Sequence, residues 1–171
     1  MSDAKRFRWA PYASVGWLSA SFIWHVWMAI FPGSDESNAG PWDYTAFMVY
    51  DSLIIFMSLV GAVLSLATVS TWGRTLPRWL VLLPLTFGCA LLVVRGVPGM
   101  IENLLVVTGI TPRGVVGLWD SSAQEISAGE LWRTLVINSY FFVGALFLIP
   151  TTRSYARRVR TAPTAQESAH R

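Results

Sequence analysis

The chain has 171 residues, of which 53% are hydrophobic and only 13% are charged, and its mean hydropathy is +0.47. About a quarter of the residues in soluble domains are charged, so this composition excludes an ordinary water-soluble domain. The formal net charge of +3 is small, and its distribution along the chain says more than its size.

Four apolar segments follow one another and predict an all-α integral membrane protein, a four-helix bundle. A membrane-spanning helix needs roughly 20 apolar residues, so a chain of this length has room for four spans and no separate soluble domain. The expected spans are about residues 12–31, 45–69, 79–94 and 131–150. They form one transmembrane domain over residues 1–160, with Ser127 and Glu130 at capping-box spacing before the last span. Residues 161–171 are polar and small, and we expect a disordered cytoplasmic tail there.

The basic residues predict the orientation of these spans. Ten of the thirteen lysines and arginines fall on one side of the predicted membrane: Lys5, Arg6, Arg8, Arg74, Arg78, Arg153, Arg157, Arg158, Arg160 and Arg171. The positive-inside rule makes that side cytoplasmic. We therefore expect a multi-pass protein of the cell membrane with both termini inside and with the loops at about residues 33–44 and 95–130 outside.

The stretch RGVPGMIENLL, residues 95–105, interrupts the apolar pattern after the third span. Pro98 lacks a backbone donor and disfavours helix at the residue before it. We expect a broken helix here, as either a kinked continuation of the span or a short helix lying in the outer interface. Both place Arg95, Glu102 and Asn103 near the outer leaflet, where the simplest account is that the charged side chains snorkel to water.

Each span contributes a polar residue in the outer half of the membrane. His25 lies six residues before the end of the first span, and Asp51 lies six residues after the start of the second. At 1.5 Å per residue both are about 9 Å below the outer surface, and Asn138 enters the fourth span from the same side. An ionisable group inside the membrane is by default a functional-site hypothesis. The alternative is a structural hydrogen bond between Asp51 and His25 or Arg95, and the sequence leaves the functional and the structural reading open.

Aromatic residues are concentrated at the same depth. Most of the nine tryptophans lie at predicted interfaces and form an aromatic belt. The aromatic side chains that fall deeper, in the outer half of the spans, are Trp24, Trp27, Phe47, Tyr50, Tyr140, Phe141 and Phe142. Aromatic faces stabilise cations where water is excluded, although ordinary aromatic packing also explains such residues. An acid among aromatic rings suits protonation of an alkene and guidance of the resulting carbocation.

Several other classes of site are not supported by the sequence. The two histidines and the single cysteine, Cys89, provide no metal-ligand spacing, so we expect neither a metal nor another cofactor. A phosphate-binding glycine loop and a nucleophile elbow are also missing. The basic segment RSYARRVR directly follows a span, which indicates topology and lipid headgroups rather than nucleic acid.

Two resemblances bear on function. The run from Arg95 to Ile110 and the Trp24-His25-x-Trp27 stretch resemble segments of small four-span actinobacterial membrane proteins of unknown function. In size and character the chain also resembles the bacterial membrane-bound terpene cyclases of drimentine-type secondary metabolism, which cyclise farnesylated indole diketopiperazines. The resemblance implies an isoprenoid cyclase, and it assigns a role to no individual residue.

The leading hypothesis is a metal-independent membrane terpene cyclase, an isomerase that starts the reaction by protonating a lipophilic prenylated substrate. Asp51 or Glu102 would donate the proton, and His25 would orient the acid or accept the final proton. The expected substrate pocket is formed by Trp24, Trp27, Phe47, Tyr50, Arg95, Asn103, Asn138 and Tyr140. The alternatives are a non-catalytic accessory or small-molecule-binding membrane protein, in which the polar cluster is structural, and a proton-coupled carrier. A carrier is disfavoured because internal repeats and ionisable groups in the inner half are missing. The substrate, the oligomeric state and the choice of acid stay open.

Overall fold

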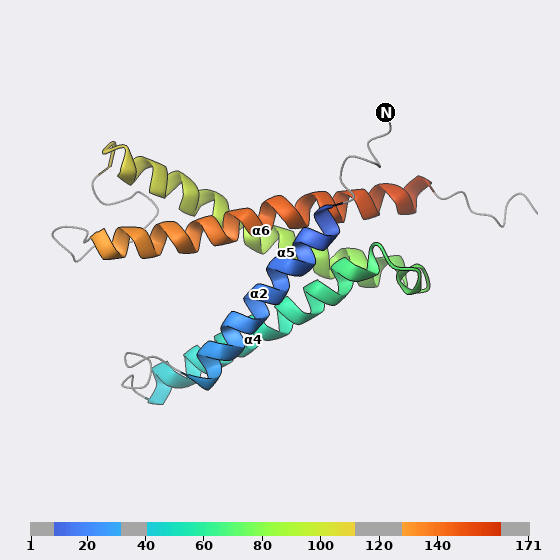
Figure 1. The fold of residues 1–171 in the computed structure, drawn as a ribbon, viewed down its shortest axis with the longest axis horizontal. Coiled ribbons are helices and arrows are strands. Elements are labelled where there is room, and N and C mark those ends of the chain that lie inside the picture. The colour runs from blue at the N-terminus through green and yellow to red at the C-terminus, as the bar shows by residue number, and fades with distance from the viewer. Residues whose placement is uncertain (1–8, 32–40, 112–127, 162–171) are drawn as a thin grey trace, which may run out of the picture.

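The computed structural model describes residues 9–31, 41–111 and 128–161. These residues form α2 (Ala10–Ile30), α4 (Pro41–Ala67), the short 3₁₀ helix η1 (Trp72–Arg74), α5 (Arg78–Val107) and α6 (Ala128–Thr161) (Figure 1). The four α-helices are each long and apolar enough to cross a membrane. The predicted all-helical fold with four spans is thus confirmed, whereas Ser127 and the tail after Thr161 lie outside the described residues.

The helices are arranged as two hairpins. α2 packs against α4, and α5 packs against α6; the main contact between the hairpins is that of α2 with α6. The hairpins meet where α2 begins and α6 ends, and they diverge toward the other end of the molecule (Figure 1). The largest apolar side chains of the buried core are Leu18, Leu64, Leu85, Leu92, Leu148 and Tyr155, so every long helix contributes to it.

Most apolar side chains point away from this core. Trp79, Leu83 and Val94 of α5 are each more than 60% exposed, although they belong to one of the most apolar helices of the chain. A soluble protein would bury such a surface, but a helix surrounded by lipid has no reason to. The outward apolar surface therefore agrees with four helices that cross a membrane.

Glycines let the helices approach closely. A Cβ atom on Gly96 of α5 would lie 2.7 Å from the backbone nitrogen of Phe142 in α6. A Cβ atom on Gly144 of α6 would overlap the indole ring of Trp17 in α2. Close approach through small residues is the usual way in which membrane helices gain packing contacts.

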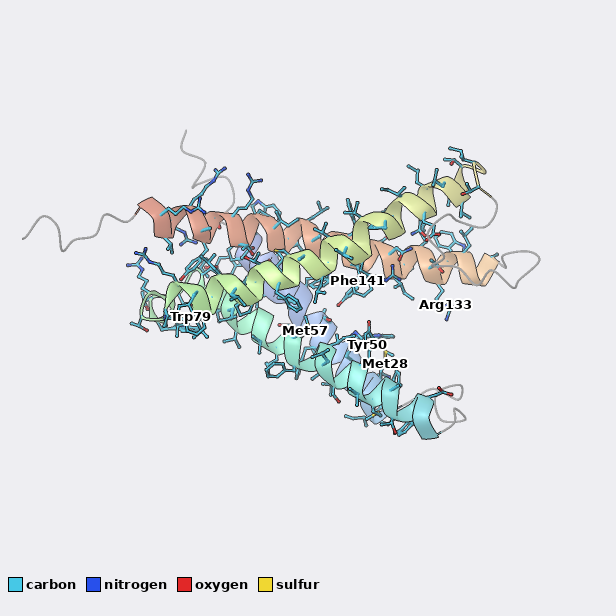
Figure 2. All side chains as sticks on the ribbon, turned by 180° about the vertical axis from the view of Figure 1, so that it is seen from behind. Met28, Tyr50, Met57, Trp79, Arg133 and Phe141 are labelled. Carbon is cyan, nitrogen blue, oxygen red and sulfur yellow. The ribbon has the colours of Figure 1, made fainter. Side chains whose placement is uncertain are left out.

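The helix of the third span, expected at about residues 79–94, continues beyond its predicted end. α5 continues as one helix from Arg78 to Val107 and includes Pro98, although it changes direction in its second half (Figure 2). Of the two alternatives, the structure thus shows residues 95–107 as a continuation of the helix and not as a separate interfacial helix. Pro98 removes one hydrogen bond, and the packing of Gly96 and Gly99 against α6 supports the helix on both sides of it. Arg95 is consequently the eighteenth of the 30 residues of α5 and lies near its middle.

α6 is also longer than the predicted fourth span. The helix was expected to end at Pro150, yet it includes Pro150 and runs on to Thr161. The additional turns carry arginines, and because these side chains are polar, the hydropathy pattern of the sequence stops before the helix does. A helix can extend into water beyond the apolar part of its span, which is why sequence patterning underestimates its length.

The close contact at Gly144 predicts the effect of a single methyl group. Gly144→Ala should lower the free energy of unfolding by about 1–3 kcal/mol, because the added carbon would overlap the Trp17 ring, which is stacked on Tyr140. Gly16→Ala is the matched control, since a Cβ atom there meets nothing within 4 Å. The control should be neutral or stabilising by up to ~1 kcal/mol through helix propensity. Thermal unfolding in detergent measures both, and equal midpoints for Gly144→Ala and the wild type would contradict the packing.

Candidate functional site

The shortest polar contact between α2 and α4 joins His25 to Asp51. The His25 Nδ1 atom lies 2.6 Å from the Asp51 Oδ1 atom, and Asp51 is only 1% exposed. The two residues meet because α2 and α4 are antiparallel and each contributes its polar residue at the same level. Of the two partners that the sequence suggested for Asp51, the structure therefore provides His25 and not Arg95.

The second carboxyl oxygen of Asp51 is chemically distinct from the first. The Oδ2 atom is buried and has no hydrogen-bond partner among the described residues. The side chain of His25 is 17% exposed, so the pair is not completely enclosed. The arrangement leaves one carboxyl oxygen held by a histidine and the other available to a further group.

A separate polar network joins α5 to α6 through Asn138, which is completely buried. Its amide oxygen accepts a hydrogen bond of 2.6 Å from Arg95. Its amide nitrogen donates to the carbonyl oxygen of Gly99 at 3.1 Å and to the side-chain oxygen of Asn103 at 3.0 Å. A Cβ atom on Gly99 would lie 2.5 Å from the Asn138 Oδ1 atom, so the glycine makes room for this contact.

Arg95 contacts two uncharged side chains, an amide and an aromatic ring, rather than an acid. Its guanidinium carbon lies 5.3 Å from the ring centre of Phe141, in addition to the hydrogen bond to Asn138. In the described part of the chain Arg95 makes no ion pair. Glu102, the other acid in this region, is completely buried on α5 next to Asn103. The cation and the amides together fasten α5 to α6.

The polar residues expected to form one set thus fall into two groups on different hairpins. Within the described ranges, no hydrogen bond or ion pair joins His25 or Asp51 to Arg95, Asn103 or Asn138. Aromatic rings connect the hairpins instead. Trp17 of α2 stacks on Tyr140 of α6 with ring centres 4.7 Å apart, and Tyr140 contacts Phe141 edge-on at 5.6 Å.

The aromatic residues beside His25 and Asp51 lie on the surface of the helices. Trp24, Trp27 and Tyr50 are each more than half exposed, while Phe47 and Tyr140 are partly buried. Figure 2 shows Tyr50 on α4 in the region where the two hairpins diverge. These exposed rings are accessible to lipid or to a lipophilic molecule, and they do not form a closed lining.

Sequence reasoning missed the buried hydroxyl contacts of α2. Ser58 donates a hydrogen bond of 3.1 Å to Ser21, and Ser14 lies 2.9 Å from the hydroxyl of Thr151. A signal was available, because serines recur at seven-residue intervals in both of the first two spans. Such spacing places them on one face of each helix.

Similarity offers no further guide to this site. No protein-family model matches the chain, and neither the curated proteins nor the solved structures include a significant match. In the described residues no group of three or more His, Cys, Asp or Glu is arranged to hold a metal ion. The function must therefore be argued from the chemistry of the residues themselves.

The Asn138 network predicts a large loss of stability when its centre is removed. Asn138→Ala should lower the free energy of unfolding by about 1–3 kcal/mol or more, because Arg95 and Asn103 lose their buried partner. Ser139→Ala is the neighbouring control, since the Ser139 hydroxyl makes only a weak 3.5 Å contact with the sulfur of Met100. Chemical unfolding in detergent compares the variants, and equal stabilities of the two would rule out a central role for Asn138.

Proposed function

We propose that the chain is a multi-pass protein of the cell membrane with both termini in the cytoplasm. The support comes from the described arginines, most of which lie at the end where the hairpins meet: Arg74, Arg78, Arg153, Arg157, Arg158 and Arg160. A concentration of basic residues at one end of a membrane bundle marks the cytoplasmic side.

This orientation is testable by labelling single cysteines in intact cells. In a Cys89→Ser background, Gly129→Cys at the start of α6 should react with a membrane-impermeant maleimide, and Arg160→Cys at its end should react only after the cells are opened. Both sites are exposed in the protein, so accessibility to the reagent depends on the side of the membrane. The reversed pattern would contradict the orientation.

We further propose that the protein is a membrane terpene cyclase that protonates a lipophilic prenylated substrate. The observation that carries this proposal is the buried Asp51–His25 pair with its free Oδ2 atom. The proton of the Asp51 carboxyl passes to an alkene carbon, so an O–H bond breaks and a C–H bond forms. The carboxylate that remains is stabilised by the hydrogen bond from His25, which makes proton donation easier.

The surroundings of the pair suit a cation and an oily substrate. Trp24 precedes His25 and Tyr50 precedes Asp51, and both rings are exposed rather than used in the core. Aromatic faces stabilise a carbocation most strongly where water is excluded. The substrate would reach the pair laterally from the bilayer, and loss of a proton after ring closure would complete an isomerisation that needs no further reactant.

Asp51 is a better candidate for the acid than Glu102. Asp51 is paired with His25 through one carboxyl oxygen, and the pair lies next to the exposed rings of Trp24 and Tyr50. Glu102 is enclosed beside Asn103, in the region where α5 is fastened to α6. We assign proton donation to Asp51, its orientation to His25, and a structural role to Arg95, Asn103 and Asn138.

The cyclase proposal predicts a product of unchanged mass. Membranes that contain the protein should convert a farnesylated indole compound into an isomer with altered chromatographic retention. Asp51→Asn should reduce the rate by about 10²-fold or more, the usual contribution of a general acid, while Glu102→Gln should retain activity if it folds. Liquid chromatography with mass spectrometry measures the isomer. Loss of activity in Glu102→Gln alone would reassign the acid, and no isomer from a panel of prenylated compounds would favour a non-catalytic membrane protein.

A further inference from the structure

Buried hydroxyl groups continue from the Asp51–His25 pair toward the end where the hairpins meet. The nearest is the hydrogen-bonded pair of Ser21 and Ser58, and further along lies the pair of Ser14 and Thr151. None of these four residues is more than 4% exposed. The Thr151 hydroxyl donates its hydrogen to the carbonyl oxygen of Phe147. In its contact with Ser14 it is therefore the acceptor, and the two hydrogen bonds run in the same direction, from Ser14 through Thr151 to Phe147.

The spacing along α2 places polar groups on one face of the helix. Ser14, Trp17, Ser21 and His25 are separated by three, four and four residues, so successive groups are about one helical turn apart. Trp17 lies between the two serines along α2, and its indole nitrogen is itself a donor. The face therefore carries a polar atom at every turn from Ser14 to His25.

α4 repeats this pattern in the opposite direction. Asp51, Ser58 and Ser65 follow one another at seven-residue steps, and Ser65 is completely buried. The antiparallel register, in which Ser58 meets Ser21 and Gly61 meets Leu18, places Ser65 at the level of Ser14. We call the hydroxyl groups of Ser14, Ser21, Ser58, Ser65, Tyr140 and Thr151 the hydroxyl column.

A second observation shows that this region needs further hydrogen-bonding groups. Four buried polar atoms here have no hydrogen-bond partner among the described residues: Trp17 Nε1, Asp51 Oδ2, Ser65 Oγ and the hydroxyl of Tyr140. The Tyr140 hydroxyl lies beside Ser21, and its ring stacks on Trp17. Buried polar groups without a protein partner are satisfied by ordered water, so these atoms mark positions where water would connect one hydroxyl to the next.

We infer that the hydroxyl column conducts protons between the inner end of the bundle and Asp51. Each hydroxyl accepts a proton on its oxygen while it gives its own proton to the next acceptor, so no member of the column changes its charge. The Asp51 carboxylate regains in this way the proton that it gave to the substrate, even when the product loses its proton elsewhere. The inference rests on the proposed function in that Asp51 is taken as a proton donor.

The test uses the fact that the chain has only two histidines, His25 and His170. The protein would be placed in nanodiscs with ¹⁵N-labelled histidine and the change His170→Ala, so that His25 gives the remaining histidine signal in the NMR spectrum. The hydrogen between His25 Nδ1 and Asp51 is then assigned, and saturation transfer from water measures its exchange rate. In the double variant Ser21→Ala with Ser58→Ala, exchange should slow by about tenfold or more, because a positioned hydroxyl accelerates proton transfer strongly. Thr152→Val is the matched control, since its buried hydroxyl contacts Cys89 outside the column and its loss should leave the exchange rate unchanged.

Two outcomes would overturn the inference. One is exchange at the wild-type rate in the double variant, and the other is equal slowing in the double variant and in Thr152→Val. If the double variant does not fold, Tyr140→Phe keeps the stacked ring and removes one hydroxyl of the column, and its exchange must be slowed. The measurement needs no substrate, so a failed cyclisation assay would count against the enzyme while slowed exchange would still support the column.

Discussion

Lipid offers a polar side chain no water to bind, and this constraint governs the contacts between the helices. A polar group that faces another helix is stabilised by a hydrogen-bond partner on that helix, and removal of the partner is costly. Asn138 illustrates the result, because its amide binds Arg95, the carbonyl of Gly99 and Asn103 with both of its polar atoms. Gly99 leaves space for this contact, since a side chain at position 99 would collide with the Asn138 amide. The pairing of α5 with α6 depends on this fit.

The same constraint gives the two hairpins different roles. Between α5 and α6 the amide oxygen and the amide nitrogen of Asn138 are both hydrogen-bonded, and these contacts stabilise one arrangement of the two helices. Between α2 and α4 the groups are only partly used, since Asp51 keeps a free oxygen and Ser65 has no partner in the described part of the chain. A buried polar atom without a partner is unfavourable for stability, and the one on Asp51 lies beside exposed aromatic rings, where we place the proposed chemistry. The stacked rings of Trp17 and Tyr140 and the hydrogen bond between Ser14 and Thr151 hold the two hairpins together.

The sequence predicts the number and order of the helices because hydropathy and length decide which segments enter a membrane. It also predicts that His25 and Asp51 share a level, since antiparallel neighbours bring together residues equally far from their loop. It does not predict that α5 passes through Pro98 intact, because the support comes from contacts of Gly96 and Gly99 with another helix. Nor does it predict that Arg95 and Asp51 belong to different groups, since depth in the membrane says nothing about which helices diverge. The expected roles in catalysis stay predictions.

The separation of the two polar groups is the central claim, and thermodynamic coupling tests it most directly. Unfolding free energies would be measured for His25→Ala, Asp51→Ala, Asn138→Ala and the two double variants that contain Asp51→Ala. The structure predicts a coupling of about 0.5–3 kcal/mol between His25 and Asp51, which are in contact, and additivity within about 0.5 kcal/mol between Asp51 and Asn138. Strong coupling between Asp51 and Asn138 would contradict the account, because it would join both groups into one network across the hairpins.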